Sequence, residues 1–145
     1  MLLTSFMTIL YVDDDADDRQ IFEEAVKSLD AGHKCVTERD GLGALTYLSN
    51  HPPPDIIFLD LNMPMMDGKT CLAEIRGNKK TKRLPVIIFT TSGSPGDKSQ
   101  CQQLGATDYV LKPVSFVHMR EILRAILRSA DQSLFTKNSI GSGSR

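Results

Sequence analysis

The stretch Ile56-Ile57-Phe58-Leu59-Asp60 consists of four apolar residues followed at once by an aspartate. Three similar apolar runs occur elsewhere: Ile9-Leu10-Tyr11-Val12, Val86-Ile87-Ile88-Phe89 and Tyr109-Val110-Leu111. Their apolar residues are continuous rather than alternating with polar ones, which is typical of strands that are buried on both faces. The more polar segment Lys34–Glu38 is a fifth candidate, as expected for a strand at the edge of a sheet.

Helical periodicity fills the segments between these strands. The apolar residues at helical spacing are Ile21, Phe22, Ala25, Val26 and Leu29; Leu42, Leu45 and Leu48; Cys71, Leu72 and Ile75; and Phe116, Met119, Ile122, Leu123, Ile126 and Leu127. Ser94-Pro95 predicts the start of one further helix, and Leu104-Gly105 predicts its end. Five alternating β-α units predict an α/β fold with a parallel sheet, right-handed crossovers and helices on both faces.

The length and charge of the chain fit a single domain. Its 145 residues, 41% of them hydrophobic, suffice for one domain with a substantial core. The net charge of −1 argues against a nucleic-acid binder, and the basic run from Arg76 to Arg83 contains no aromatic residue and is interpreted as a solvated loop. Helical periodicity ends near Ser129, so we expect a domain over residues 7–128 and a flexible C-terminal tail over 129–145.

The sequence also favours a cytoplasmic protein without membrane association. Its three cysteines are far apart, which is typical of reduced thiols rather than a disulfide framework or a zinc site. No apolar run reaches membrane-spanning length. The apolar segment Met1–Val12 lacks the preceding basic residues and the small cleavage-site residues of a signal peptide.

Polar residues follow the carboxyl ends of four predicted strands. They are Asp13 and Asp14, Asp60, Thr90 and Lys112. Open parallel sheets bind ligands at this edge, so these side chains are expected to face one crevice.

Three carboxylates in one crevice repel one another. Two unit charges about 5 Å apart cost about 3 kcal/mol at an effective dielectric constant of about 20. A cation must compensate, and the oxygen ligands of Asp13, Asp14 and Asp60, with no histidine or cysteine nearby, fit Mg²⁺. Together with the ammonium group of Lys112 and the hydroxyl group of Thr90, they predict a phosphoryl-transfer site. In that site Asp60 would be the nucleophile.

The acidic run near the start of the chain divides into two parts. It holds five aspartates in six positions. Asp13 and Asp14 belong to the predicted site. Asp15, Asp17 and Asp18 are interpreted as the start and cap of the first helix, because carboxylates stabilise the positive end of a helix dipole.

The chain resembles the receiver domain of two-component response regulators in five motifs that occur in the expected order. The motifs are the first strand with Asp13-Asp14, the loop from Asp60 to Gly68, the strand ending in Thr90, Gly105-Ala106 leading to Tyr109, and Lys112-Pro113. The resemblance covers about residues 7 to 128. It implies a doubly wound, flavodoxin-like (βα)5 fold with strand order 2-1-3-4-5.

The resemblance implies roles for the acidic residues. Asp60 would accept a phosphoryl group from a phosphohistidine on a sensor histidine kinase or a histidine phosphotransfer protein. Mg²⁺ would be bound directly by Asp14 and Asp60, by the backbone carbonyl of Asn62, and through water by Asp13. The protein would be a phosphoacceptor signalling module, not an enzyme, that promotes its own Mg²⁺-dependent phosphorylation and dephosphorylation.

The same resemblance implies a conformational switch. Lys112 would pair with the phosphoryl oxygens, and Thr90 would hydrogen-bond to one of them. Tyr109 would swing inward as Thr90 moves, which would change the surface offered to a downstream protein. The Lys112–Pro113 bond is expected to be cis. We expect a stand-alone receiver that is monomeric or forms a homodimer on phosphorylation, with no nucleic-acid partner.

Two other functions fit parts of the sequence. The segment Leu10–Asp15 also resembles the nucleophile motif of haloacid-dehalogenase-type phosphatases, with its first aspartate attacking and its third as acid/base. That family needs a late acidic pair for its metal, whereas the only acids after Lys112 are Glu121 and Asp131. A receiver that acts as a constitutive scaffold is the other alternative, and the presence of every site residue argues against it.

Overall fold

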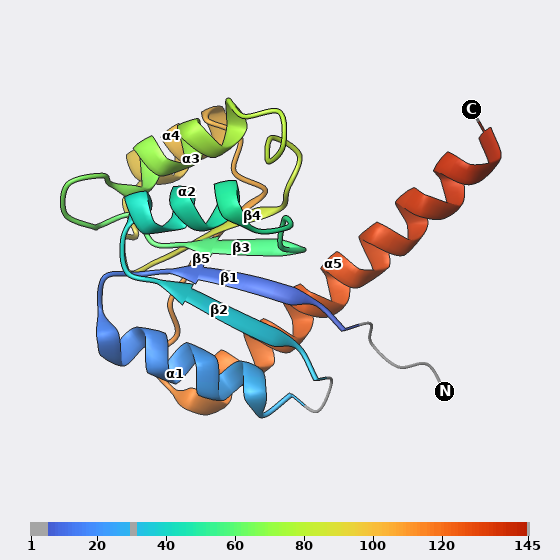
Figure 1. Ribbon diagram of the computed structural model, residues 1–145. Helices are drawn as coiled ribbons and strands as arrows, with labels where there is room; N and C mark the ends of the chain where they lie inside the picture. Colours follow the sequence, from blue (N-terminus) through green and yellow to red (C-terminus); the bar gives the residue numbers. More distant parts are fainter. Residues whose placement is uncertain (1–5, 30–31, 145) are drawn as a thin grey trace.

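The computed structural model describes residues 6–29 and 32–144, with side chains described up to residue 131. Strands and helices alternate along the chain, as the sequence predicts (Figure 1). They are β1 (Thr8–Val12), α1 (Ala16–Lys27), β2 (Lys34–Glu38), α2 (Gly41–Asn50), β3 (Ile56–Leu59), α3 (Gly68–Arg76), β4 (Val86–Thr90), α4 (Pro95–Gln103), β5 (Asp108–Leu111) and α5 (Phe116–Ser144).

The five strands form one sheet in the order β2-β1-β3-β4-β5, which confirms the predicted topology. Every neighbouring pair of strands is parallel. Helices α1 and α5 cover one face of the sheet, and α2, α3 and α4 cover the other (Figure 1). After β1 the chain adds β2 on one side and then β3 on the other, so the strand order reverses between β1 and β3. Sheets of this kind bind ligands at the carboxyl ends of the strands where the order reverses.

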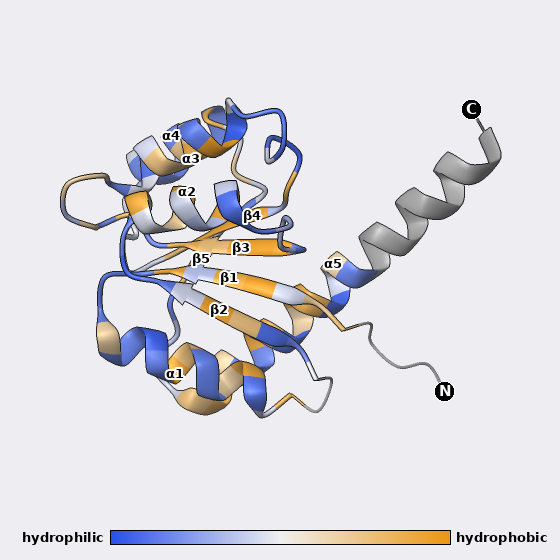
Figure 2. Cartoon of the chain, in the orientation of Figure 1, coloured by the Kyte–Doolittle hydropathy of each residue, from blue (hydrophilic) through white to orange (hydrophobic). Residues whose placement is uncertain are grey.

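Two hydrophobic layers, one on each face of the sheet, form the core. In β1, Ile9 and Tyr11 enter the layer under α1 and α5, whereas Leu10 and Val12 enter the layer under α2, α3 and α4. Successive strand residues point to opposite faces, so a strand covered on both sides needs apolar residues at every position. Figure 2 shows the resulting hydrophobic strands between helices with hydrophilic outer faces. The strand prediction from continuous apolar runs is confirmed.

An aromatic cluster occupies the layer under α1 and α5. The ring of Phe22 in α1 stacks on Tyr11 at a centroid distance of 4.0 Å. It also makes edge contacts with Phe58 at 5.1 Å and with Phe89 at 5.9 Å. All four rings are buried. The cluster therefore joins α1 to three adjacent strands and holds Tyr11 beneath the carboxyl edge of the sheet.

Side chains cap the N-termini of four helices, each of which begins after the carboxyl end of a strand. Asp15, Asp40, Asp67 and Ser94 each accept a hydrogen bond from a backbone N–H in the first turn of the following helix. Such caps satisfy N–H groups that have no partner within the helix. The predicted roles of Asp15 and of Ser94-Pro95 as helix starts are confirmed. Gly105, with φ of 99°, takes the left-handed conformation that follows many helix ends.

Two features of the backbone differ from the predictions. Helix α5 continues to Ser144, where the sequence predicts a flexible tail from residue 129. The segment from Phe116 to Ile140 contains no proline or glycine that would end a helix. The Lys112–Pro113 peptide bond is trans, so the prediction of a cis bond was wrong. The trans isomer is the more stable form of an ordinary bond before proline.

None of the helices in the described part of the chain combines the length and apolar character needed to cross a membrane.

Candidate functional site

Three carboxylates meet at the carboxyl edge of the sheet. Asp13 follows β1, and Asp60 follows the neighbouring strand β3. One oxygen each from Asp13, Asp14 and Asp60 lies within 4.8 Å of the other two. Asp13 and Asp60 are buried, whereas Asp14 is exposed. The structure therefore brings together the three acids that the sequence singles out.

Lys112 lies close to two of these acids and to a further one, Asp18. Its Nζ atom is 2.6 Å from Asp13 Oδ2, 2.9 Å from Asp18 Oδ2 and 3.5 Å from Asp60 Oδ2. Burial alone would lower the pKa of Lys112, but its hydrogen bonds to Asp13 and Asp18 raise the pKa above the ordinary value. The side chain therefore remains an ammonium ion at neutral pH and offsets part of the negative charge.

The contact with Asp18 corrects one sequence interpretation. The sequence predicts only a helix-start role for Asp18, yet its carboxylate accepts a hydrogen bond from Lys112. Its backbone N–H does bond to the cap residue Asp15, so Asp18 serves both the helix and the site. Its position in the first turn of α1 gives no sequence signal for this second contact.

Asp13 is held by groups that the sequence analysis missed. The buried hydroxyl of Tyr11 donates a hydrogen bond to Asp13 Oδ2. The backbone N–H of Asp15 donates to Asp13 Oδ1 at 3.0 Å, and Arg19 donates to its carbonyl oxygen at 2.8 Å. Burial and the bond to Asp13 raise the pKa of Tyr11, so the phenol stays protonated as a donor. The spacing of two residues, which places Tyr11 and Asp13 on one side of the strand, is a signal that would have indicated this pair.

The Asp60 carboxylate lies in a strongly polar but desolvated position. Its Oδ1 atom accepts a hydrogen bond from the Leu61 N–H at 2.9 Å, and the hydroxyl of Thr90 also bonds to this carboxylate. Burial raises the pKa of Asp60, Lys112 opposes that rise, and the charge of Asp13 adds to it. The net result is a pKa above the ordinary value, so ionised Asp60 costs folding free energy in the absence of a cation.

Replacing Asp60 with asparagine is therefore expected to stabilise the fold at neutral pH. When the folded-state pKa of a carboxyl is raised, the unfolded chain loses its proton first and stability falls as the pH rises through both pKa values. The stability difference between Asp60→Asn and the unaltered chain should vanish at acid pH, below the ordinary pKa of aspartate. Urea denaturation from pH 3 to pH 8 without divalent cations measures this. An unchanged or lower stability of Asp60→Asn at pH 7 would contradict the assignment of burial as the dominant cause.

Gly68 packs against the backbone of Asp60 and Leu61 and so helps to fix the position of Asp60. A Cβ atom at Gly68 would lie 2.2 Å from the carbonyl oxygen of Asp60 and 2.7 Å from the Cα atom of Leu61. The N–H of Gly68 also donates to the Leu61 carbonyl at 2.8 Å. The first turn of α3 therefore packs directly on the backbone that carries Asp60, and only glycine leaves room for this approach.

The change Gly68→Ala is expected to lower the free energy of unfolding by about 1–3 kcal/mol, because the new methyl group displaces backbone atoms. Gly77→Ala at the other end of α3 is a matched control, since its Cβ would be no closer than 3.4 Å to its neighbours. Urea denaturation should find the control within about 0.5 kcal/mol of the unaltered chain. Equal losses in both variants would refute the steric argument.

Thr90 and Tyr109 are linked through one intervening residue. Thr90 is buried at the end of β4, and its Oγ1 atom accepts a hydrogen bond from the Ser92 N–H at 3.3 Å. The hydroxyl of Tyr109 donates to the carbonyl oxygen of Ser92 at 2.8 Å. The Tyr109 ring is partly buried against the core layer under α2, α3 and α4. Tyr109 therefore faces inward in this structure.

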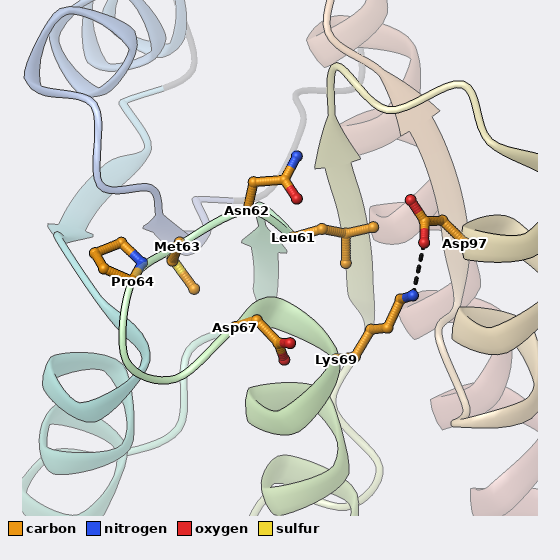
Figure 3. A pocket seen from close by; sticks show the side chains of 7 residues that line it. All are labelled: Leu61, Asn62, Met63, Pro64, Asp67, Lys69 and Asp97. Atoms are coloured by element: carbon orange, nitrogen blue, oxygen red, sulfur yellow. Dashed lines mark hydrogen bonds and ion pairs between the residues drawn. The ribbon is translucent and has the colours of Figure 1, made fainter.

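Asn62 is one of the residues that line a pocket next to the loop after Asp60. The side chain is exposed, and with its neighbours it lines a cavity of about 420 Å³ between the loop after β3, α3 and α4 (Figure 3). The lining residues are Leu61, Asn62, Met63, Pro64, Asp67, Lys69 and Asp97. An ion pair between the last two crosses one side of the pocket.

The donor set of the acidic cluster fits a hard divalent cation. It consists of carboxylate oxygens from two buried residues and one exposed residue, without nitrogen or sulfur ligands among them. Such oxygen ligands suit Mg²⁺ and Mn²⁺. The exposed position of Asp14 leaves room for the water ligands that Mg²⁺ usually retains.

The fold and this site agree with a known family. Residues 9–127 match the sequence model of the response regulator receiver domain, and the chain therefore belongs to the response regulator receiver family. This result confirms the resemblance inferred from the five motifs, and it makes the chain a signalling module of two-component systems.

Individual relatives give the same assignment. The chain is 34% identical over 124 residues to "Response regulator Rcp1" of Synechocystis sp., which covers 81% of this chain and 84% of that protein. It is 36% identical to "Probable transcriptional regulator ycf27" of Guillardia theta over 93% of this chain, but spans only 51% of that protein. The chain is thus similar in extent to the first relative and about half the length of the second.

Solved structures confirm the fold. The phosphorylated cyanobacterial phytochrome response regulator RcpA matches with a TM-score of 0.78 and 33% identity, over 84% of this chain and 91% of that one. The Mn²⁺-bound form of response regulator Rcp1 matches with a TM-score of 0.73 and 34% identity, over 80% of this chain and 91% of that one. The chain is therefore a receiver domain homologous to response regulators such as Rcp1, and the Mn²⁺-bound form of that relative agrees with the acidic cluster found here.

Proposed function

We propose that this receiver accepts a phosphoryl group on Asp60 and signals through the arrangement of Thr90 and Tyr109. The surroundings of the Asp60 carboxylate support this function most directly. Its carboxylate is buried, lies 3.5 Å from Lys112 Nζ and shares the crevice with oxygens of Asp13 and Asp14. A desolvated carboxylate beside an ammonium ion and a cation site is suited to attack phosphorus.

The two oxygens of Asp60 have different surroundings. Oδ1 accepts the hydrogen bond from Leu61 N–H, whereas Oδ2 faces Lys112. We assign Oδ2 as the nucleophile. It forms a bond to phosphorus while the bond from phosphorus to the histidine nitrogen breaks, and the nitrogen keeps the electron pair. Lys112 and the hydroxyl of Thr90 are placed to stabilise the negative oxygens of the transferring group.

The proposed cofactor is Mg²⁺. Asp14 and Asp60 would bind it directly, Asn62 through its backbone carbonyl, and Asp13 through water. When bound, the cation neutralises charge on the phosphoryl oxygens. Asp13 fits the indirect role, because both of its carboxylate oxygens already accept hydrogen bonds within the protein.

The proposed partners follow from this chemistry. A sensor histidine kinase or a histidine phosphotransfer protein supplies the phosphoryl group, and a cytoplasmic target protein reads the surface around α4, β5 and α5. Residues 7–128 form the functional unit, as a monomer or a phosphorylation-dependent homodimer without a nucleic-acid partner. The receiver promotes its own phosphorylation and dephosphorylation with Mg²⁺.

The test is incorporation of phosphate from a labelled small acyl-phosphate donor. We expect labelling that requires Mg²⁺, is lost on chelation, and is absent in Asp60→Asn. Asp17→Asn is the matched control, because Asp17 belongs to the same acidic run but is exposed in α1. Full labelling of Asp60→Asn would exclude Asp60 as the acceptor.

The phosphatase alternative is disfavoured by the surroundings of Asp13. Its side chain is fully buried, and Oδ2 is engaged by both Tyr11 and Lys112. The other oxygen accepts the N–H of Asp15. A carboxylate with both oxygens engaged and no exposure is a poor nucleophile for a phosphate ester. Turnover of phosphate esters by the purified protein would reverse this conclusion.

A further inference from the structure

A chain of polar contacts links α3 to the switch residues. Lys69 lies in the first turn of α3, and its Nζ atom is 2.6 Å from Asp97 Oδ1 in the first turn of α4. Lys69 also donates a hydrogen bond to Gln100 of the same helix. Figure 3 shows the ion pair between Lys69 and Asp97 beside the loop that carries Asn62.

The second oxygen of Asp97 continues this chain of contacts. Asp97 Oδ2 accepts a hydrogen bond from Ser92 Oγ at 2.6 Å. The backbone of Ser92 in turn donates to Thr90 Oγ1 and accepts the hydroxyl of Tyr109. A single residue in the β4–α4 loop is therefore bonded to Asp97, Thr90 and Tyr109. Any movement of Ser92 changes all three contacts.

The ion pair is fully charged at neutral pH but open to solvent. The hydrogen bond from Lys69 lowers the pKa of Asp97, and the bond from Ser92 lowers it further. The side chains of Lys69 and Asp97 are 29% and 28% exposed. Because salt screens exposed charges, the strength of this link is expected to depend on ionic strength.

The geometry points to Lys69 as a positioning residue that, through Asp97, fixes Ser92 where its carbonyl receives the Tyr109 hydroxyl. Lys69 thus favours the inward position of Tyr109 before any phosphoryl group is present. The effect on phosphorylation rests on the proposed function of Asp60. If phosphorylation favours inward Tyr109, then an ion pair that stabilises the same arrangement favours phosphorylation by linkage.

The direct test follows Tyr109 in the unphosphorylated chain without metal or donor. The chain has three tyrosines, so fluorotyrosine labelling gives three ¹⁹F resonances, and Tyr109→Phe assigns the relevant one. We expect Lys69→Met to shift the Tyr109 resonance toward that of exposed fluorotyrosine. Lys69→Arg, which keeps the ion pair, should restore the original position. Lys98→Met is the matched control, since Lys98 is the exposed neighbour of Asp97 in α4.

The salt dependence of the Tyr109 resonance is a second measurement. The resonance should not change with salt if Lys69 acts only through packing and not through its charge. Raising NaCl from about 0.05 M to about 1 M shortens the screening length from more than 10 Å to about 3 Å. The Tyr109 resonance of the unaltered chain should then move in the direction produced by Lys69→Met. In Lys69→Met itself, the salt-dependent shift should be absent.

The phosphorylation readout uses a double-mutant cycle. Lys69→Met should slow labelling by the acyl-phosphate donor about two- to fivefold, the range expected for an exposed pair worth up to about 1 kcal/mol. Lys69→Met combined with Asp97→Asn should be no slower than Lys69→Met alone, because the amide oxygen of asparagine can still accept the Ser92 hydroxyl and both changes then break only the ion pair. Additive losses would overturn the proposed link.

The two proposals can fail separately. An unchanged Tyr109 resonance in Lys69→Met, with normal Mg²⁺-dependent labelling of Asp60, overturns the role of Lys69 and leaves the phosphoacceptor function intact. Labelling that persists in Asp60→Asn overturns the phosphoacceptor function. The Tyr109 measurement still decides the positioning role in that case, because it involves no phosphoryl transfer.

Discussion

Replacing Lys112 with methionine is expected to slow phosphorylation by an acyl-phosphate donor about 100-fold or more. The ammonium group lies 3.5 Å from the oxygen assigned as the nucleophile, where charge develops on the transferring group. Loss of one fixed donor at such a position costs about 100- to 1000-fold in rate. Initial labelling rates at saturating Mg²⁺ measure the effect.

The same replacement removes the nearest cation from a fully buried carboxylate. Lys112 Nζ is 2.6 Å from Asp13, and breaking a buried ion pair from one side costs about 3–5 kcal/mol. The variant should therefore unfold at a lower urea concentration. Lys112→Met combined with Asp13→Asn should recover part of this stability but none of the labelling rate. A similar loss of stability and rate in Lys98→Met would show that Lys112 has no special role.

Lys112→Arg separates charge from shape. Arginine keeps the positive charge but replaces a compact ammonium group with a planar fork. We expect stability close to that of the unaltered chain, with a slower labelling rate. Equal rates for Lys112→Arg and the unaltered chain would mean that only charge matters at this position.

Phe22→Ala is expected to lower the free energy of unfolding by about 3–5 kcal/mol, the usual cost of truncating a buried phenylalanine. The ring is fully buried and contacts Tyr11, Phe58 and Phe89. Its removal leaves a cavity between α1 and three strands. Urea denaturation measures the loss. If the alanine variant does not fold, Phe22→Leu is measured in its place and should show a smaller loss.

The adjacent residue supplies the control for this core position. Ile21 is 39% exposed, so Ile21→Ala should cost no more than about 1 kcal/mol. Comparable losses for Ile21→Ala and Phe22→Ala would contradict the placement of the aromatic cluster in the core.

The sequence predicts the fold well because both faces of the sheet are covered. That arrangement demands uninterrupted apolar residues, and β3 is found where Ile56–Leu59 predicts it. The polar edge strand Lys34–Glu38 is also confirmed. The clustering of Asp13, Asp14 and Asp60 follows from the same topology, since carboxyl ends of parallel strands lie at one edge.

Contacts between the first turns of separate helices could not be predicted. Lys69 and Asp97 are 28 residues apart, and their pairing depends on how α3 and α4 are rotated against the sheet. The contact of Asp18, in the first turn of α1, with Lys112 after β5 depends in the same way on how α1 is rotated against the sheet. Local spacing carries no information about such rotations. The trans Lys112–Pro113 bond was missed because the cis expectation came from the resemblance alone.

The pairing of β1 with β3 also makes the acidic cluster a property of the folded state alone. Asp13 and Asp60 are far apart along the chain and meet only when these strands lie side by side. In the unfolded chain their carboxylates separate, so a divalent cation finds no preformed site. A cation that binds the cluster therefore stabilises the native state by mass action, by about 2.7 kcal/mol at one hundred times its dissociation constant. Cation supply is thus coupled to the stability of the receiver, before any phosphoryl group is transferred.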